Sequence, residues 1–104
     1  MTVDETSGTP GTVVRNEARS RYELLVDGEV VGFADHRPGA GSRTVFPHTV
    51  IDADRRGQGL GAVLVRGALD DVRARGGTVE PLCWYVARFI DENPEYRSLL
   101  GESG

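Results

Sequence analysis

Residues 55–61, Arg-Arg-Gly-Gln-Gly-Leu-Gly, are the part of the sequence best suited to hold a charged ligand. They stand between an apolar extended run and a long amphipathic segment. Backbone N–H groups at the start of a helix bind anions, and glycines remove the side chains that would block their approach. The helix dipole adds about half a positive charge at that end, and an arginine can donate two parallel hydrogen bonds to a phosphate. We therefore expect a diphosphate-binding loop here.

Cys83 and His48 are the side chains outside this loop that could take part in a reaction. The single cysteine falls where a helix is expected to begin, and helix N–H groups favour the thiolate that acts as a nucleophile. The alternative is a core residue, since free cysteine is among the most buried residue types. His48 can accept an amine proton near neutral pH or fill a hydrogen-bonding niche in a strand. His36 stands next to a turn and is expected to be exposed.

Three extended runs before the loop predict an antiparallel meander. Residues 22–26 and 29–34 are rich in β-branched and aromatic residues, and an Asp-Gly dipeptide between them accepts the positive φ angles of a tight hairpin. A Pro/Gly-rich turn at 37–42 leads to a third run over 43–51. The third strand therefore delivers the chain to the glycine-rich loop.

The spacing of apolar residues changes after the loop. Apolar residues recur at four-residue steps from Leu60 to Val72, which predicts a helix packed on the sheet, and Gly76-Gly77 supplies its left-handed end. Residues 78–83 are short and extended, so the order strand, helix, strand predicts a crossover between parallel strands. A helix over 84–91 and a last helical turn complete an α/β (α+β) fold with a mixed sheet.

Two common phosphate loops do not fit residues 55–61. The segment lacks the Lys-Ser/Thr ending of a Walker loop, and no parallel strand precedes it as a dinucleotide fold requires. Its pattern, Arg/Gln-x-x-Gly-x-Gly/Ala at Arg56, Gly59 and Gly61, resembles the coenzyme A signature of the GNAT superfamily of acetyltransferases. The order of meander, loop, helix and fifth extended segment is also similar to that superfamily.

A closer resemblance, to the small single-domain YjdJ-type branch of the superfamily, rests on three further segments. These are Phe46-Pro47-His48-Thr49, Pro81-Leu82-Cys83-Trp84-Tyr85-Val86 and Asn93-Pro94-Glu95-Tyr96. The resemblance implies transfer of acetyl from acetyl-coenzyme A to an amine of a small molecule or a peptide, without a metal.

The resemblance also implies where the cofactor binds. The loop amides would hold its diphosphate, and backbone groups freed where two strands splay apart would hold its pantetheine. Pro81, which cannot donate a ladder hydrogen bond, is consistent with such an opening. The candidate cofactor-binding residues are Val50, Ile51, Arg55, Arg56, Gly57, Gln58, Gly59, Leu60 and Gly61. The candidate catalytic residues are Cys83, His48 and Tyr85.

One position departs from the branch pattern, because members often carry a glutamate directly after the His-Thr pair and this chain has Val50. Another group such as His48 then serves as the base, or the amine loses its proton to water before attack, or no catalysis occurs. A non-catalytic acyl-coenzyme A-binding or interaction module is therefore the alternative function, and a loop for a free nucleotide is a third. Tyr85 and Tyr96 are candidates for protonating the leaving thiolate, with core packing as the alternative.

Length and composition set the remaining expectations. The 104 residues, 38% of them hydrophobic, fit one domain, expected over 20–100 between flexible tails at 1–19 and 101–104. The net charge of −4 argues against a nucleic-acid partner. A single cysteine excludes an internal disulfide, no stretch approaches a membrane span, and no cluster has metal-ligand spacing. We expect a cytoplasmic monomer or weak homodimer with neither metal nor membrane partner.

Overall fold

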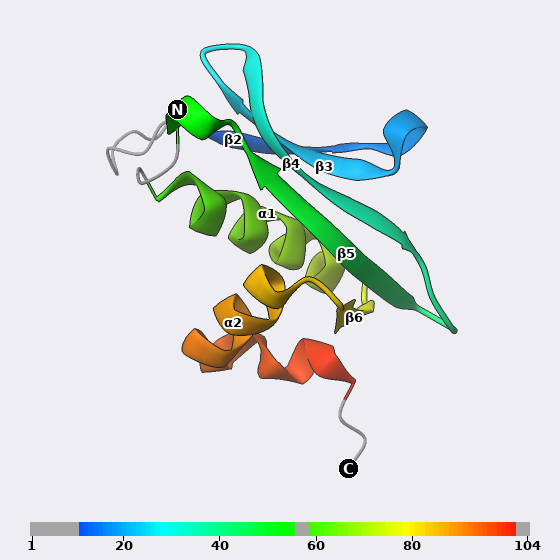
Figure 1. Ribbon diagram of the computed structural model, residues 1–104. Coiled ribbons are helices and arrows are strands. Elements are labelled where there is room, and N and C mark those ends of the chain that lie inside the picture. Colours follow the sequence, from blue (N-terminus) through cyan, green and yellow to red (C-terminus); the bar gives the residue numbers. More distant parts are fainter. Residues whose placement is uncertain (1–10, 56–58, 102–104) are drawn as a thin grey trace.

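The computed structural model describes residues 11–55 and 59–101, which form a five-stranded mixed sheet with helices packed against it (Figure 1). The strand order is β2-β3-β4-β5-β6; the first four strands are antiparallel and β6 runs parallel to β5. The α/β fold class with a meander and a crossover is confirmed. The elements are β2 (Thr12–Asn16), η1 (Glu17–Arg19), β3 (Arg21–Val26), β4 (Glu29–Pro38), β5 (Arg43–Ile51), η2 (Ala53–Arg55), α1 (Leu60–Ala74), β6 (Thr78–Pro81), α2 (Trp84–Glu92) and η3 (Pro94–Leu100).

The first strand, β2, corrects the expected tail over residues 1–19, because residues 12–19 are folded. β2 pairs antiparallel with β3 from Thr12 opposite Leu25 to Asn16 opposite Arg21. Asn16 then caps η1, its side-chain oxygen accepting a hydrogen bond from the N–H of Arg19 at 3.1 Å. A five-residue strand with two valines carries too little apolar pattern to be recognised in the sequence. Residues 1–10 and 102–104 lie outside the described residues.

Turn residues fix the hairpin and the end of the main helix as predicted. Asp27 and Gly28 both have positive φ, 52° and 81°, which matches the right-handed twist of the two strands they join. At the carboxyl end of α1, Gly77 N–H donates to the Val72 carbonyl and Gly76 N–H to the Arg73 carbonyl, both at 3.0 Å. These two hydrogen bonds form a Schellman motif that satisfies the last carbonyls of α1.

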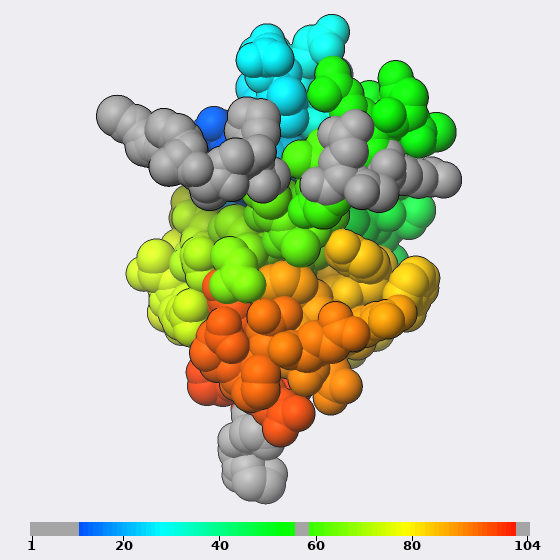
Figure 2. All heavy atoms as spheres, turned by 90° about the vertical axis from the view of Figure 1, so that its left-hand side faces the viewer, coloured from blue at the N-terminus to red at the C-terminus, as the bar shows by residue number. Residues whose placement is uncertain are grey.

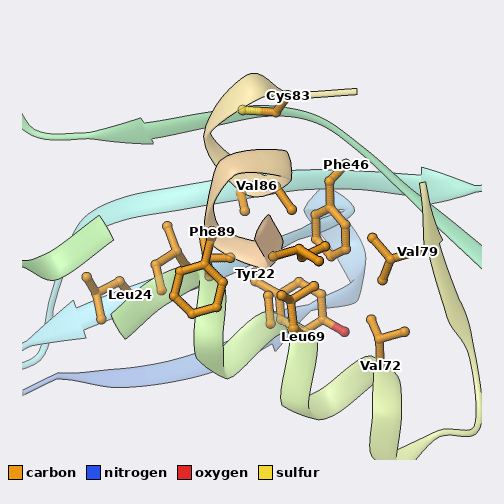
Figure 3. Close-up of a cluster of buried hydrophobic side chains, with 14 of the residues drawn as sticks. Tyr22, Leu24, Phe46, Leu69, Val72, Val79, Cys83, Val86 and Phe89 are labelled. Carbon is orange, nitrogen blue, oxygen red and sulfur yellow. The ribbon is translucent and has the colours of Figure 1, made fainter. Parts of the chain in front are cut away.

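One apolar core joins the sheet to α1 and α2. Tyr22 and Phe46 from the sheet meet Leu69 from α1 and Phe89 from α2 in a continuous buried cluster (Figure 3). Burying a side chain of this size stabilises the fold by roughly 1.5–3 kcal/mol. Seen from the side, α2 and η3 fill one end of the molecule next to α1 (Figure 2). The core therefore fixes both helices against the strands that carry the site.

The sheet opens between β5 and β6. Their pairing runs from Arg43 opposite Thr78 to Phe46 opposite Pro81 and ends there, whereas β5 continues to Ile51. On its other side β5 contains a bulge, because its pairing with β4 shifts between Asp35 and Arg37. An extra residue in one strand bends that strand. The predicted splay after Pro81 is therefore present in the fold.

Candidate active site

The candidate active site is a cavity of about 670 Å³ at the opening between β5 and β6. It reaches from the amino end of α1 to the start of α2. Within 11–55 and 59–101, every predicted cofactor-binding residue lines it, as do Cys83, His48 and Tyr85, although these residues are up to 37 positions apart, from His48 to Tyr85. The lining residues are His48, Thr49, Val50, Ile51, Arg55, Gly59, Leu60, Gly61, Cys83, Trp84 and Tyr85. The predicted Arg56, Gly57 and Gln58 lie outside the described residues.

The amino end of α1 presents backbone rather than side chains to the cavity. Gly59 precedes the helix with a φ of 77°, a left-handed conformation that favours glycine. Leu60 is 4% exposed and its side chain belongs to the core, so its backbone N–H is what Leu60 offers to a ligand. The N–H groups of this first turn have no intrahelical acceptor. This end of the helix therefore suits an anion.

Arg55 adds a positive charge beside these amides. Arg55 lines the cavity, and its Nη2 is 4.0 Å from the carboxylate of Glu29. An ion pair this long with an exposed glutamate is weak in water. The guanidinium can therefore turn to a phosphate without losing a strong partner.

Tyr85 packs directly against Gly61. A Cβ atom added at Gly61 would lie 2.5 Å from the Tyr85 hydroxyl oxygen, so any larger residue here would have to displace the ring or the start of α1. Burial raises the pKa of Tyr85, and the nearby Glu92 raises it further. The phenol is thus protonated at neutral pH and can act as a proton donor inside the cavity.

Cys83 stands at the border between the core and the cavity. It is 9% exposed, precedes α2, and its N–H donates to the Phe46 carbonyl at 2.8 Å. Its thiol donates to Thr49 Oγ1 at 3.6 Å. Figure 3 shows Cys83 at the margin of the buried cluster, beside the strand. Cys83 is therefore buried and also part of the cavity wall.

Two cavity residues were not predicted from the sequence. Thr49 accepts the hydrogen bond from Cys83, and Trp84 is 69% exposed at the start of α2. The indole of Trp84 meets the ring of Tyr85 edge to face, with centroids 5.7 Å apart. Exposure of a tryptophan depends on tertiary packing, so no pattern in the sequence could have indicated it.

Tyr96 follows the core-packing alternative, and the expected exposure of His36 is wrong. Tyr96 does not line the cavity; its hydroxyl donates to Asp70 Oδ1 at 2.7 Å and accepts from Arg66 Nη1 at 3.2 Å, which makes it a core anchor. His36, expected at the surface, is 8% exposed. Its ring packs beside Tyr22, with centroids 5.1 Å apart, because this stretch of β4 faces the core.

Within residues 11–55 and 59–101, no group of three or more His, Cys, Asp and Glu residues is placed to hold a metal ion. No helix in that part is long and apolar enough to cross a membrane.

Comparison with known proteins identifies the family of the chain. Residues 21–99 match the model of the GCN5-related N-acetyl-transferases. An L-methionine sulfoximine/L-methionine sulfone acetyltransferase of Pseudomonas aeruginosa is 40% identical over 67 residues, covering 57% of this chain and 39% of that protein. Protein NATD1 of Bos taurus is 36% identical over 55 residues, covering 52% and 49%. The chain thus spans less than half the length of either relative.

A solved structure agrees on the fold. The ribosomal-protein-S18-alanine N-acetyltransferase from Escherichia coli superposes with a TM-score of 0.53 at 21% identity, covering 71% of this chain and 43% of that chain. The protein belongs to the GCN5-related N-acetyltransferase (GNAT) family, because the family model spans most of its length. The resemblance to this superfamily is confirmed, and the likeness to its YjdJ-type branch stays a prediction.

Proposed function

We propose that the protein transfers an acetyl group from acetyl-coenzyme A to an amine of a small molecule or a peptide. The proposal rests on the cavity between β5 and β6, which joins the amino end of α1 to a gap in the sheet. Coenzyme A needs both features, because its diphosphate requires an anion site and its pantetheine amides require backbone partners. The volume, about 670 Å³, lies within the roughly 300–1,000 Å³ usual for small-molecule sites.

Backbone amides at the start of α1 would hold the diphosphate. The N–H groups of Leu60 and Gly61 are free of intrahelical acceptors, and the left-handed Gly59 turns the chain into the helix without a side chain in the way. Arg55 would add a charge-assisted hydrogen bond. The pantetheine would then lie along the end of β5. The further predicted cofactor residues are Val50, Ile51, Arg56, Gly57 and Gln58.

The transfer needs one base and one acid. The neutral amine nitrogen attacks the thioester carbonyl carbon, the C–S bond breaks, and the products are an N-acetyl amine and the thiol of coenzyme A. His48, exposed at the cavity, takes the proton that the amine nitrogen loses. Tyr85 gives its proton to the departing thiolate and regains one from solvent; its raised pKa keeps the phenol protonated before the transfer.

The position of Cys83 favours a second route. Attack of its sulfur on the thioester would release coenzyme A and leave an acetyl thioester on Cys83, which the amine then cleaves. Thr49 fixes the sulfur at the cavity through their 3.6 Å contact. Mass spectrometry after incubation with acetyl-coenzyme A alone distinguishes the routes, because only the second leaves an acetyl group on wild-type protein that Cys83→Ser lacks.

Release of coenzyme A thiol in the presence of a panel of amines tests the proposal. The panel includes L-methionine sulfoximine and L-methionine sulfone, after the Pseudomonas relative, and a peptide that begins with alanine, after the ribosomal-protein enzyme. We expect amine-dependent release that slows about 10²-fold in His48→Gln and Tyr85→Phe. The affinity for acetyl-coenzyme A should stay within a few-fold in both variants.

Two outcomes would overturn the proposal. If acetyl-coenzyme A binds but no amine, peptide or Cys83 accepts the acetyl group, the chain is an acyl-coenzyme A-binding module. The apolar Val50, where a carboxylate base is common, supports that alternative. If calorimetry shows ATP or NAD binding more tightly than acetyl-coenzyme A, the loop holds a free nucleotide instead.

A further inference from the structure

The sheet has an inner face, which packs against α1 and α2, and an outer face on the other side (Figure 1). Residues of β4 alternate between the two. Ala34 and His36 are buried on the inner face, whereas Phe33 and Asp35 are half-buried and point outward. His48 of β5 lies on the outer face as well, because it is paired in register with Asp35 and its ring centroid is 6.4 Å from that of Phe33. The candidate base therefore faces away from the helices.

Neighbouring residues of β5 reach the two sides of the candidate active site. Thr49 points to the inner face, where its Oγ1 accepts the hydrogen bond of the Cys83 thiol at 3.6 Å. His48 and Val50, on either side of Thr49, point to the outer face. All four residues line the same cavity. Since the amino end of α1, which would hold coenzyme A, belongs to the inner side, an acceptor that arrives from the outer face would meet His48 without crossing the cofactor.

Asp35 is the carboxylate next to His48. The two residues are directly opposite each other in the pairing of β4 with β5. Side chains at such positions have Cβ atoms about 4.5–5.5 Å apart. Within residues 11–55 and 59–101, the Asp35 side chain forms no ion pair and no hydrogen bond, with His48 or with any other residue. Its negative charge is therefore available to a ligand beside the candidate base.

Arg21 lies on the other side of Asp35 but does not neutralise it. The two are paired in the register of β3 with β4. However, the Arg21 Nε donates to the carboxylate of Glu23 at 2.9 Å, and its guanidinium lies over the ring of Phe33, 4.3 Å from the centroid. These two contacts hold the arginine away from Asp35. The carboxylate of Asp35 thus stands between a cation with its own partner and the imidazole of His48.

We propose that Asp35 selects the acceptor by binding the ammonium group of an amine that has no carboxylate beside the reacting nitrogen. Aliphatic amines are protonated at neutral pH, as lysine is with a pKa of about 10.4. An ammonium nitrogen between Asp35 and His48 donates one N–H to the carboxylate and passes a proton to the imidazole, which leaves a neutral amine for attack. A carboxylate on the adjacent carbon would be repelled by Asp35. This role rests on the proposed transfer to an amine.

Phenethylamine and phenylalanine are matched probes, because they differ only in the carboxylate. Each is titrated into protein saturated with coenzyme A, which carries no acetyl group, so that binding is measured without transfer. Ring signals of His48 in NMR spectra report binding, and those of His36, buried on the inner face, are the internal control. We expect saturable shifts at His48 alone and a Kd at least about tenfold lower for phenethylamine.

Two results of this titration would overturn the proposal. One is the absence of saturable shifts at His48 with phenethylamine. The other is tighter binding of phenylalanine, which would assign the acceptor's carboxylate to a cation such as Arg37, two residues from Asp35 on β4. By contrast, the expected preference without release of coenzyme A thiol from acetyl-coenzyme A would support the amine site and count against the transfer, so the two failures are distinguishable.

Variants of Asp35 test the residue itself. Asp35→Asn keeps the shape but removes the charge, so it should weaken phenethylamine binding about tenfold or more and leave phenylalanine binding unchanged or tighter. Asp35→Glu keeps the charge and should retain part of the preference. Asp91→Asn is the matched control, because Asp91 is exposed on α2 and pairs with Arg97 at 3.6 Å, and it should leave both probes unaffected. The melting temperature should hold in Asp35→Asn, which breaks no ion pair to a described residue. Equal weakening of both probes in Asp35→Asn, or none for phenethylamine, would overturn the proposal.

Discussion

Replacing Gly61 by alanine tests how the cofactor site is built. A Cβ atom at this position would lie 2.5 Å from the Tyr85 hydroxyl oxygen and 2.9 Å from its ring carbon Cζ. Atoms cannot approach that closely, so either the ring or the start of α1 must shift. Because Tyr85 is half-buried at the cavity wall, we expect its ring to move into the space assigned to coenzyme A.

Opposing terms set the expected change in stability. Overpacking costs about 1–3 kcal/mol, whereas replacing a helical glycine by alanine contributes about 0.5–1 kcal/mol. The Gly61→Ala variant should therefore lose about 0–2.5 kcal/mol of unfolding free energy, which a domain of typical stability tolerates. We expect the Kd for acetyl-coenzyme A to rise at least tenfold, or about 1.4 kcal/mol.

The same substitution at Gly67 is the matched control. Its Cβ atom would lie 2.6 Å from Val13 Cβ, an equally close contact in the same helix, but Gly67 does not line the candidate active site. Isothermal titration calorimetry with acetyl-coenzyme A gives the affinity of both variants, and urea unfolding gives their stability. Both should lose stability, and Gly61→Ala alone should lose affinity.

A Tyr85→Ala background separates the clash from other effects of the new methyl group. Without the ring, adding Gly61→Ala should cost little further affinity, so the two changes should be strongly non-additive. The reasoning is refuted if Gly61→Ala binds acetyl-coenzyme A as tightly as the wild type. It is equally refuted if Gly61→Ala weakens binding by the same factor with and without the ring.

Three further predictions concern single residues. Gly59→Ala should lower the unfolding free energy by about 1–2 kcal/mol, because Gly59 has a φ of 77°, and thermal melts should show a drop of about 4–8 °C per kcal/mol. Burial and the hydrogen bond to Asp71 raise the pKa of Tyr22 to about 12, so the wild type should lose about 2 kcal/mol of stability as pH rises from 10 to 12. Tyr22→Phe should lose less over that range, measured by urea unfolding at each pH. Burial lowers the pKa of His36, so its contribution is full above pH 6.5 and declines below it. His36→Phe should flatten the dependence of stability on pH between 7 and 5, and an unchanged slope would contradict this assignment.

The elements that the sequence predicts well are those fixed by local chemistry. The Asp27-Gly28 turn and the Gly76-Gly77 helix end need only their own φ angles, and both occur as expected. The four-residue spacing of apolar residues likewise places α1 at Leu60–Ala74 without tertiary information. The splay between β5 and β6, by contrast, was expected only from the resemblance to the GNAT superfamily.

The features that the sequence does not predict depend on residues far apart in the chain. β2 is an edge strand, and its apolar residue Val13 packs against Gly67 of α1, a contact that the sequence of β2 alone does not indicate. The contact of Thr49 with Cys83 joins two elements 34 residues apart. The spacing of apolar residues indicates which face of an element is buried, but it does not indicate which residues of other elements pack against that face.

The short pairing between β5 and β6 has a consequence for motion. Four register pairs and two flanking bonds, from Thr78 N–H to the Ser42 carbonyl and from Cys83 N–H to the Phe46 carbonyl, join residues 78–100 to the sheet and form a short backbone seam. Short seams open locally at lower free energy than long ones, so amide hydrogen exchange should show this last part of the chain opening as a unit. Coenzyme A bound across this seam would raise the free energy of that opening by about 2.7 kcal/mol at a concentration 100 times its Kd. Amide exchange on both sides of the seam would slow accordingly. The acetyl donor would then also hold the two parts of the fold together.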